Sequence, residues 1–236
     1  MERERFAFPV GEQQTSATAY VDGAARVGRV TLILGHGAGA PQTHPWMVAM
    51  AEAIAARGLR VVTFNFLYTE GKRRMPDRPP LLEATWRAAI DAVRARFGAS
   101  RPFIGGKSMG GRIATQVAAG EGVDVAGLVL LGYPLHPPGK PEQLRVAHLP
   151  KVRAPMLFIQ GSRDAFGGTE ELAPYLVGLA PGTRLFPIEG GDHSLVRPKS
   201  SGETLAMTMG RVADEIARFA APPHPLTVPG PARPNI

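Results

Sequence analysis

Short apolar runs of strand length alternate along this chain with longer segments whose apolar residues recur at helical spacing. This alternation constrains the fold more than any other feature, because it is typical of a mainly parallel sheet with helices on both faces. We expect the first two strands to form an antiparallel pair at one edge. Strands are expected at 5–10, 15–21, 29–34, 59–66, 101–105, 125–131, 156–160 and 183–188, and helices at 44–57, 81–97, 111–119, 170–179 and 202–220.

The length and composition fit one α/β domain. The chain has 236 residues, of which 44% are hydrophobic and 20% charged, and this balance is ordinary for a globular protein with a sizeable core. We expect a single domain over residues 1–221. The stretch from 222 to 236 is rich in proline, so we expect a tail that is extended or disordered.

Several protein classes are disfavoured. No apolar segment approaches the length needed to cross a bilayer, and the mixed charges of residues 1–5 do not resemble a secretory signal. The absence of cysteine removes disulfides, thiolate metal sites and a thiol nucleophile. We therefore expect a cytoplasmic protein without membrane contact.

The net charge of +7 raises the question of nucleic-acid binding. The basic residues are scattered along the chain. Their densest cluster, Lys72, Arg73 and Arg74 with Arg78, has no interleaved aromatic residues on which bases could stack. We therefore expect no nucleic-acid partner.

The pentapeptide Gly106-Lys107-Ser108-Met109-Gly110 follows an apolar strand and precedes a helical segment. A Gly-x-Ser-x-Gly motif in a strand–turn–helix setting is typical of a nucleophilic serine, because the glycines let strand and helix approach closely around a strained Ser108. The alternative is a Gly-Ser turn that merely ends a strand.

Three further segments lie at the ends of expected strands. Asp164 follows the strand at 156–160, His193 follows the strand at 183–188, and a glycine-rich loop at 35–40 follows the strand at 29–34. The carboxyl ends of parallel strands open onto one crevice. We therefore expect Ser108, Asp164 and His193 to meet there.

With these motifs in place, the chain resembles the α/β-hydrolase superfamily, whose triads follow the same chain order of serine, acid and histidine. It is most similar to the small dienelactone-hydrolase-like and carboxylesterase-like branch. Three segments resemble uncharacterised testis-expressed-type hydrolase domains in sequence: Gly105 to Arg112, Phe64-Asn65-Phe66 and Gly161 to Asp164. The resemblance spans about residues 28–220. Dienelactone hydrolases proper usually carry a cysteine nucleophile. Because the corresponding residue here is Ser108, the resemblance does not imply the same substrate.

This resemblance implies a role for each site residue. His193 would be the general base for Ser108, Asp164 would orient His193, and the backbone N–H groups of Met109 and Ala38 would form the oxyanion hole. Asp192 is a poorer partner for His193 because the two are adjacent in sequence, and His36 is expected to support its own loop. The other histidines, at 44, 136, 148 and 224, lack metal-ligand spacing. We expect neither a metal nor an organic cofactor.

The sequence also suggests what the pocket accepts. The connection at 133–155 is too short for a large lid, which favours small or accessible esters. Cationic residues near the expected site, listed next, could form a positive rim that attracts anionic substrates. They are Lys107, Arg112 and Arg163, with the loop from Lys72 and Arg73 to Arg78. The alternatives are solvated surface charges for the loop and packing with a structural ion pair for Lys107.

We therefore predict a serine hydrolase that cleaves a carboxylic ester or thioester of a small molecule. Two alternatives stay open: an interaction module on a hydrolase fold without turnover, and an acyltransferase that uses the same residues. The acyl group, the leaving group and the oligomeric state also stay open.

Overall fold

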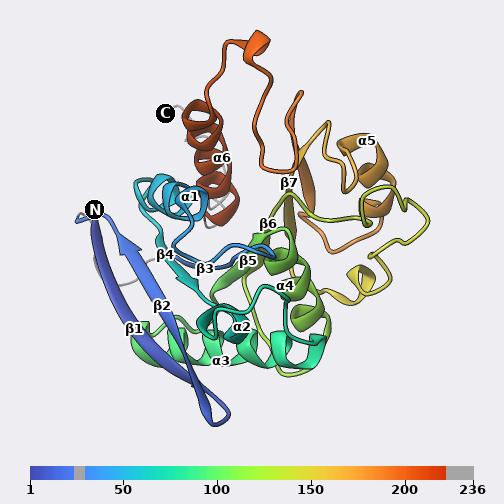
Figure 1. The fold of residues 1–236 in the computed structure, drawn as a ribbon. Helices are drawn as coiled ribbons and strands as arrows, with labels where there is room; N and C mark the ends of the chain where they lie inside the picture. Colours follow the sequence, from blue (N-terminus) through green and yellow to red (C-terminus); the bar gives the residue numbers. More distant parts are fainter. Residues whose placement is uncertain (24–29, 222–236) are drawn as a thin grey trace, which may run out of the picture.

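The computed structural model describes residues 1–23 and 30–221, and its centre is one eight-stranded sheet (Figure 1). The strand order is β1-β2-β4-β3-β5-β6-β7-β8. From β4 to β8 all neighbours are parallel, whereas β1 and β2 pair antiparallel and β2 also runs antiparallel to β4. The strands are β1 (Glu2–Val10), β2 (Gln13–Val21), β3 (Thr31–Gly35), β4 (Arg60–Phe64), β5 (Phe103–Lys107), β6 (Gly127–Leu131), β7 (Met156–Gly161) and β8 (Arg184–Ile188).

Helices cover both faces of this sheet (Figure 1). The α-helices are α1 (Pro45–Ala55), α2 (Leu67–Glu70), α3 (Pro79–Phe97), α4 (Met109–Ala119), α5 (Thr169–Leu172) and α6 (Leu205–Ala220). Short 3₁₀ turns lie at Leu149–Lys151, Ala173–Leu176 and Lys199–Ser201. The predicted architecture, a mostly parallel sheet between two helical layers, is confirmed.

Two apolar cores lie on opposite faces of the sheet. Alternate residues of a strand point to opposite faces, so Leu32 and Leu34 of β3 join the core under α1 and α6, while Ile33 joins the core under α3 and α4. The apolar residues that recur at helical spacing in the helix expected at 44–57 pack from α1 into the first of these cores, among them Met50 and Ile54, both fully buried. The periodicity therefore predicted the buried face correctly.

Three sequence predictions need correction. The helix expected at 170–179 is only the four-residue α5, followed by a 3₁₀ turn, because Pro174 has no amide hydrogen to continue the α-helix. The strand expected at 59–66 ends at Phe64, and the helical turn α2 follows it and buries Tyr68. α3 also begins earlier than expected, at Pro79, since a proline fits the first turn of a helix.

The connection from β6 to β7 carries only the 3₁₀ turn Leu149–Lys151, so no large lid domain is inserted there. No large domain inserted after β6 therefore covers the carboxyl ends of the strands. None of the helices within residues 1–23 and 30–221 is both long enough and apolar enough to cross a bilayer. The expected tail at 222–236, and Arg29 at the start of one expected strand, lie outside the described residues.

Candidate active site

Ser108 occupies a strained turn between β5 and α4. Its φ is 50° and its ψ is −114°, a conformation that side-chain-bearing residues rarely adopt and that clusters at functional sites. The flanking glycines make the turn possible. A Cβ on Gly106 or Gly110 would lie 2.1 or 2.2 Å from the carbonyl oxygen of Gly35, a contact that no side chain could make. The motif therefore places β5, α4 and the end of β3 closer together than other residues would allow.

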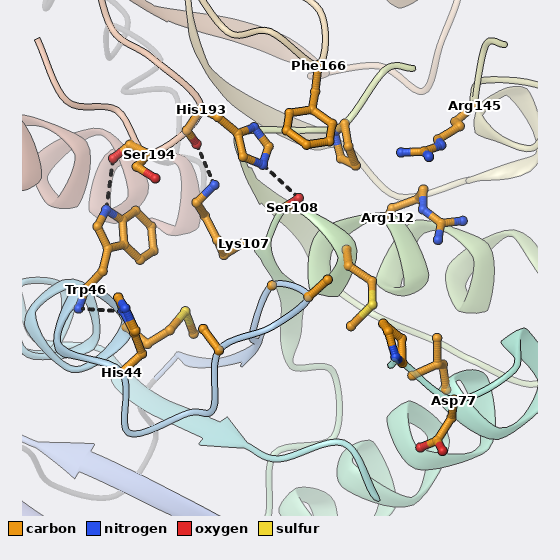
Figure 2. Close-up of a pocket in the computed structure, with 18 of the residues that line it drawn as sticks. His44, Trp46, Asp77, Lys107, Ser108, Arg112, Arg145, Phe166, His193 and Ser194 are labelled. Carbon is orange, nitrogen blue, oxygen red and sulfur yellow. Dashed lines mark hydrogen bonds between the residues drawn. The ribbon is translucent and has the colours of Figure 1, made fainter. Parts of the chain in front are cut away.

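The three residues predicted for the site form one hydrogen-bonded chain. His193 Nε2 lies 2.8 Å from Ser108 Oγ, and His193 Nδ1 lies 2.9 and 2.8 Å from the two carboxylate oxygens of Asp164 (Figure 2). An ionised carboxylate can only accept hydrogen bonds, so the Nδ1–H donates to Asp164. Nε2 is then left to accept the hydrogen bond of the Ser108 hydroxyl.

The Asp164 carboxylate is fully buried and held by two further donors. The Gln160 side-chain amide donates to Oδ2 at 3.0 Å, and the backbone N–H of Phe166 donates to Oδ1 at 2.8 Å. The Phe166 ring also stacks on His193, with ring centroids 4.2 Å apart. These contacts fix the carboxylate and the imidazole. Neither supporting residue was predicted from the sequence, although Gln160 lies near the end of β7 and Phe166 comes two residues after Asp164.

Asp192, the weaker sequence candidate, is bound within its own loop. Its Oδ1 accepts hydrogen bonds from the backbone N–H groups of Ser194 at 2.8 Å and Val196 at 2.9 Å. It therefore shapes the loop that carries His193, while Asp164 makes the bond to the imidazole.

The glycine-rich loop after β3 packs against the serine turn. His36 supports this loop as expected: its Nε2 accepts from the backbone N–H of Phe66 at 3.2 Å, and its Nδ1 donates to the carbonyl of Gly37 at 2.8 Å. Burial lowers the pKa of His36 to about 4, so its ring is neutral at pH 7. A Cβ on Gly37 would lie only 3.7 Å from Cβ of Ser108. The loop thus runs alongside the turn.

Ala38 and Met109, predicted as the oxyanion donors, both line the pocket beside Ser108. Within residues 1–23 and 30–221 neither backbone N–H donates a hydrogen bond. Met109 is the first residue of α4, where amide hydrogens have no partner inside the helix. Two unpaired amides are therefore available next to Ser108.

A pocket of about 670 Å³ lies over Ser108 and His193 (Figure 2). Its volume suits a small molecule. The wall combines apolar side chains with a few polar and charged ones. Its lining includes Trp46, Met47, Pro79, Leu82, Met109, Pro134 and Phe166 as apolar members, and His44, Asp77, Lys107, Arg112, Arg145 and Ser194 as polar members.

Lys107 lies in this pocket, but its ammonium group has a protein partner. Nζ donates to the backbone carbonyl of His193 and lies 5.7 Å from the centre of the Trp46 ring. Burial lowers the pKa of Lys107 to about 8, although the charges of Asp164 and Asp192 oppose that change. The indole of Trp46 in turn donates to the carbonyl of Ser194 at 2.9 Å. Together, Lys107 and Trp46 hold the segment that carries His193.

The other predicted cations are dispersed. Arg112 lines the pocket, whereas Lys72, Arg73 and Arg163 are exposed and are not among its lining residues. Arg73 instead pairs with Asp77 at 2.6 Å. Arg145, which no sequence motif indicated, does line the pocket.

Three of the remaining histidines make contacts within the protein. His44 accepts from the backbone N–H of Trp46 at the start of α1, His136 contacts Glu171 at 3.3 Å, and His148 contacts a threonine hydroxyl at 2.7 Å. His224 lies outside the described residues. Across the described part of the chain, no group of three or more His, Cys, Asp or Glu side chains is arranged to hold a metal ion.

Residues 28–221 match the profile of the alpha/beta hydrolase domain family, and the chain belongs to that family. Solved structures share the fold. An alpha-beta serine hydrolase homologue from Coxiella burnetii is 18% identical, with a TM-score of 0.73 over 92% of this chain and 97% of its own. A dienelactone hydrolase from Anabaena variabilis is 21% identical (TM-score 0.72, coverage 92% and 96%). A lidless serine hydrolase from Xanthomonas campestris is also 21% identical (TM-score 0.72, coverage 94% and 97%).

Proposed function

We propose that this protein is a serine hydrolase that cleaves a carboxylic ester or thioester through an acyl-enzyme on Ser108. The observation that carries the proposal is the continuous hydrogen-bonded chain from Ser108 Oγ through His193 to the buried Asp164 carboxylate. Nucleophile, base and orienting acid stand in the order that acyl transfer requires. Membership in the alpha/beta hydrolase domain family supports the same reaction class.

In the first half of the reaction, His193 Nε2 takes the proton of the Ser108 hydroxyl while Oγ forms a bond to the substrate carbonyl carbon. The carbon–oxygen or carbon–sulfur bond of the leaving group then breaks, and the leaving group receives that proton from Nε2. Asp164 stabilises the positively charged imidazole and keeps Nδ1 as the donor. Water repeats the sequence in the second half, which releases the acid and restores Ser108.

The free backbone N–H groups of Ala38 and Met109 are the proposed donors for the oxyanion that forms on the carbonyl oxygen. They belong to two different elements, the loop after β3 and the start of α4. The glycine contacts around Gly110 hold those elements together, so the donors are in place before the substrate arrives.

Three variants test this proposal against the alternative of an interaction module without turnover. We expect Ser108→Ala, His193→Asn and Asp164→Asn each to lower kcat for a neutral ester such as p-nitrophenyl butyrate by about a thousandfold or more. Exposed Arg163 provides the control, and Arg163→Gln should keep wild-type turnover. Circular dichroism checks that each variant is folded. Wild-type turnover in folded Ser108→Ala would refute the proposal.

The acyltransferase alternative shares the acyl-enzyme and differs only in the acceptor. Adding small alcohols or thiols during turnover distinguishes the two. If hydrolysis is the reaction, the free acid stays the main product. If an added acceptor takes most of the acyl group at millimolar concentration, the protein is an acyltransferase.

A further inference from the structure

Three cationic side chains line the pocket over Ser108, and they differ in whether the protein already satisfies them. Lys107 donates to the carbonyl of His193. Arg112 and Arg145 make no hydrogen bond or ion pair through their guanidinium groups within the described residues. Figure 2 shows these two arginines on the same side of Ser108, opposite Lys107 and Trp46. One side of the pocket thus carries two unpaired positive charges.

The Arg112 guanidinium lacks hydrogen-bond and charge partners among its neighbours in the described residues. Its Nε is fully buried without a hydrogen-bond partner. Its pKa is lowered, first by burial and then by the positive charge of Arg145. A buried donor without a partner destabilises the folded protein, and native structures usually satisfy such a donor with protein, ordered water, a ligand or an ion.

The two arginines are held at fixed positions relative to the nucleophile. Arg112 lies one helical turn after Ser108, whose carbonyl accepts the Arg112 backbone N–H at 3.0 Å. The backbone of Arg145 is bound on both sides: its N–H donates to Leu135 at 2.8 Å, and its carbonyl accepts from the Tyr133 hydroxyl at 2.6 Å. Both guanidinium groups are therefore carried by ordered backbone.

Among the lining residues that the structure describes, no carboxylate pairs with either arginine. The pocket-lining carboxylate, Asp77, is bound by Arg73 and by the backbone N–H of Tyr68. His148, which lies beside Arg112, contacts Thr115, and burial with the Arg112 charge lowers its pKa to about 4. It is thus neutral at pH 7. The positive charge of the arginine pair is available to a bound molecule.

We propose that Arg112 and Arg145 form an anion subsite, so that the substrate of Ser108 is an ester or thioester whose far end carries a carboxylate or phosphate group. Guanidinium groups bind both anions through paired N–H donors. Arg112 lies one helical turn after Ser108, and both residues line the same pocket, so one small molecule can reach both groups. This inference rests on the proposed function, and it specifies the substrate class of that site.

The test compares anionic and neutral esters in wild type, Arg112→Gln and Arg145→Gln. A preference for carboxylate is tested with 4-acetoxybenzoate and a preference for phosphate with 4-acetoxyphenyl phosphate. Methyl 4-acetoxybenzoate is the neutral ester for comparison. An anion on the acyl side is tested with the p-nitrophenyl monoester of adipic acid against p-nitrophenyl hexanoate. Dividing each variant's kcat/KM by that of wild type removes differences in leaving-group reactivity.

We expect each arginine variant to lower the ratio of anionic to neutral kcat/KM by about tenfold or more for at least one anionic ester, mainly through KM. Arg163→Gln, which removes an exposed arginine outside the pocket lining, should leave the ratio unchanged. The inference is overturned if the ratio stays within about twofold of wild type in both arginine variants, or if anionic and neutral esters lose activity equally.

A binding measurement separates this inference from the proposed function. Calorimetric titration of Ser108→Ala with 4-acetoxybenzoate and with 4-acetoxyphenyl phosphate needs no turnover. The subsite is supported if either compound binds Ser108→Ala saturably and one to one, and if this binding weakens about tenfold in the double variant Ser108→Ala/Arg145→Gln. This result would support the subsite even if no ester is cleaved. Turnover of neutral esters together with absence of such binding refutes the subsite and leaves the serine hydrolase standing. If Arg112→Gln fails to fold, Arg145→Gln alone decides the outcome.

Discussion

Lys107 beside the nucleophile gives a quantitative prediction, because burial of its amine disfavours the charged form. Burial lowers its pKa from 10.5 to about 8. Between these two values the unfolded chain holds the proton more tightly than the folded protein. Stability therefore rises with pH in this window, and the gain is lost again as the pH falls through about 8.

The size of the effect follows from the two pKa values. A difference of one pKa unit corresponds to about 1.36 kcal/mol, so the whole difference is worth about 3 kcal/mol, of which about 2 kcal/mol is expressed between pH 7 and pH 9.5. The matched variant is Lys107→Met, which keeps an unbranched side chain of nearly the same length but cannot titrate. Other groups titrate in both proteins and cancel.

The assay is urea unfolding at several pH values from 7 to 9.5, followed by circular dichroism. We expect the free energy of unfolding of wild type to rise by about 2 kcal/mol relative to Lys107→Met over this range. Curves that stay parallel, within the error of the extrapolation, would mean that the folded protein does not disfavour the charged amine. The assignment of Lys107 as a desolvated group would then be wrong.

Three further predictions concern the elements around the site. Gly105→Ala would place a Cβ 1.8 Å from the carbonyl oxygen of Val129, so we expect a loss of about 3 kcal/mol or more in thermal or urea unfolding, whereas Gly23→Ala, with nothing within 4 Å, should be neutral. Burial lowers the His36 pKa from 6.5 to about 4, so wild type should lose about 2 kcal/mol more than His36→Gln between pH 7 and pH 5; equal losses would contradict this. Phe166→Ala removes the ring stacked on His193 but keeps the backbone bond to Asp164, and should lower kcat between about twofold and tenfold in steady-state kinetics, with unchanged kcat as the contrary result.

The sequence was sufficient for the parts of the molecule that depend on local pattern. Apolar runs located all eight strands to within a few residues, and the strand ends indicated where Ser108, Asp164 and His193 would gather, because parallel strands share one carboxyl edge. The break in the helix expected at 170–179 could also have been predicted from the sequence, since Pro174 lies inside this range.

The sequence was not sufficient for contacts between distant segments. Arg145 lies in the proline-rich connection after β6, where no periodicity indicates which way a side chain points, yet it lines the pocket. Arg73 was expected near the substrate because its loop follows a strand, but it is bound to Asp77 instead. Lys107 was placed correctly beside the nucleophile, whereas its bond to the carbonyl of His193 depends on how two loops fold together. The role of each charged residue therefore depends on which residues, distant in sequence, lie next to it in the fold.

The most direct test of the central claim is covalent labelling with a fluorophosphonate probe, followed by mass spectrometry. The activated serine predicted here should take up one probe per chain, and trypsin should release the label on the peptide from Ser108 to Arg112. Folded Ser108→Ala should take up none, and His193→Asn should label far more slowly than wild type. Failure of folded wild type to label, or labelling at a different residue, would contradict the assignment of Ser108 as the nucleophile.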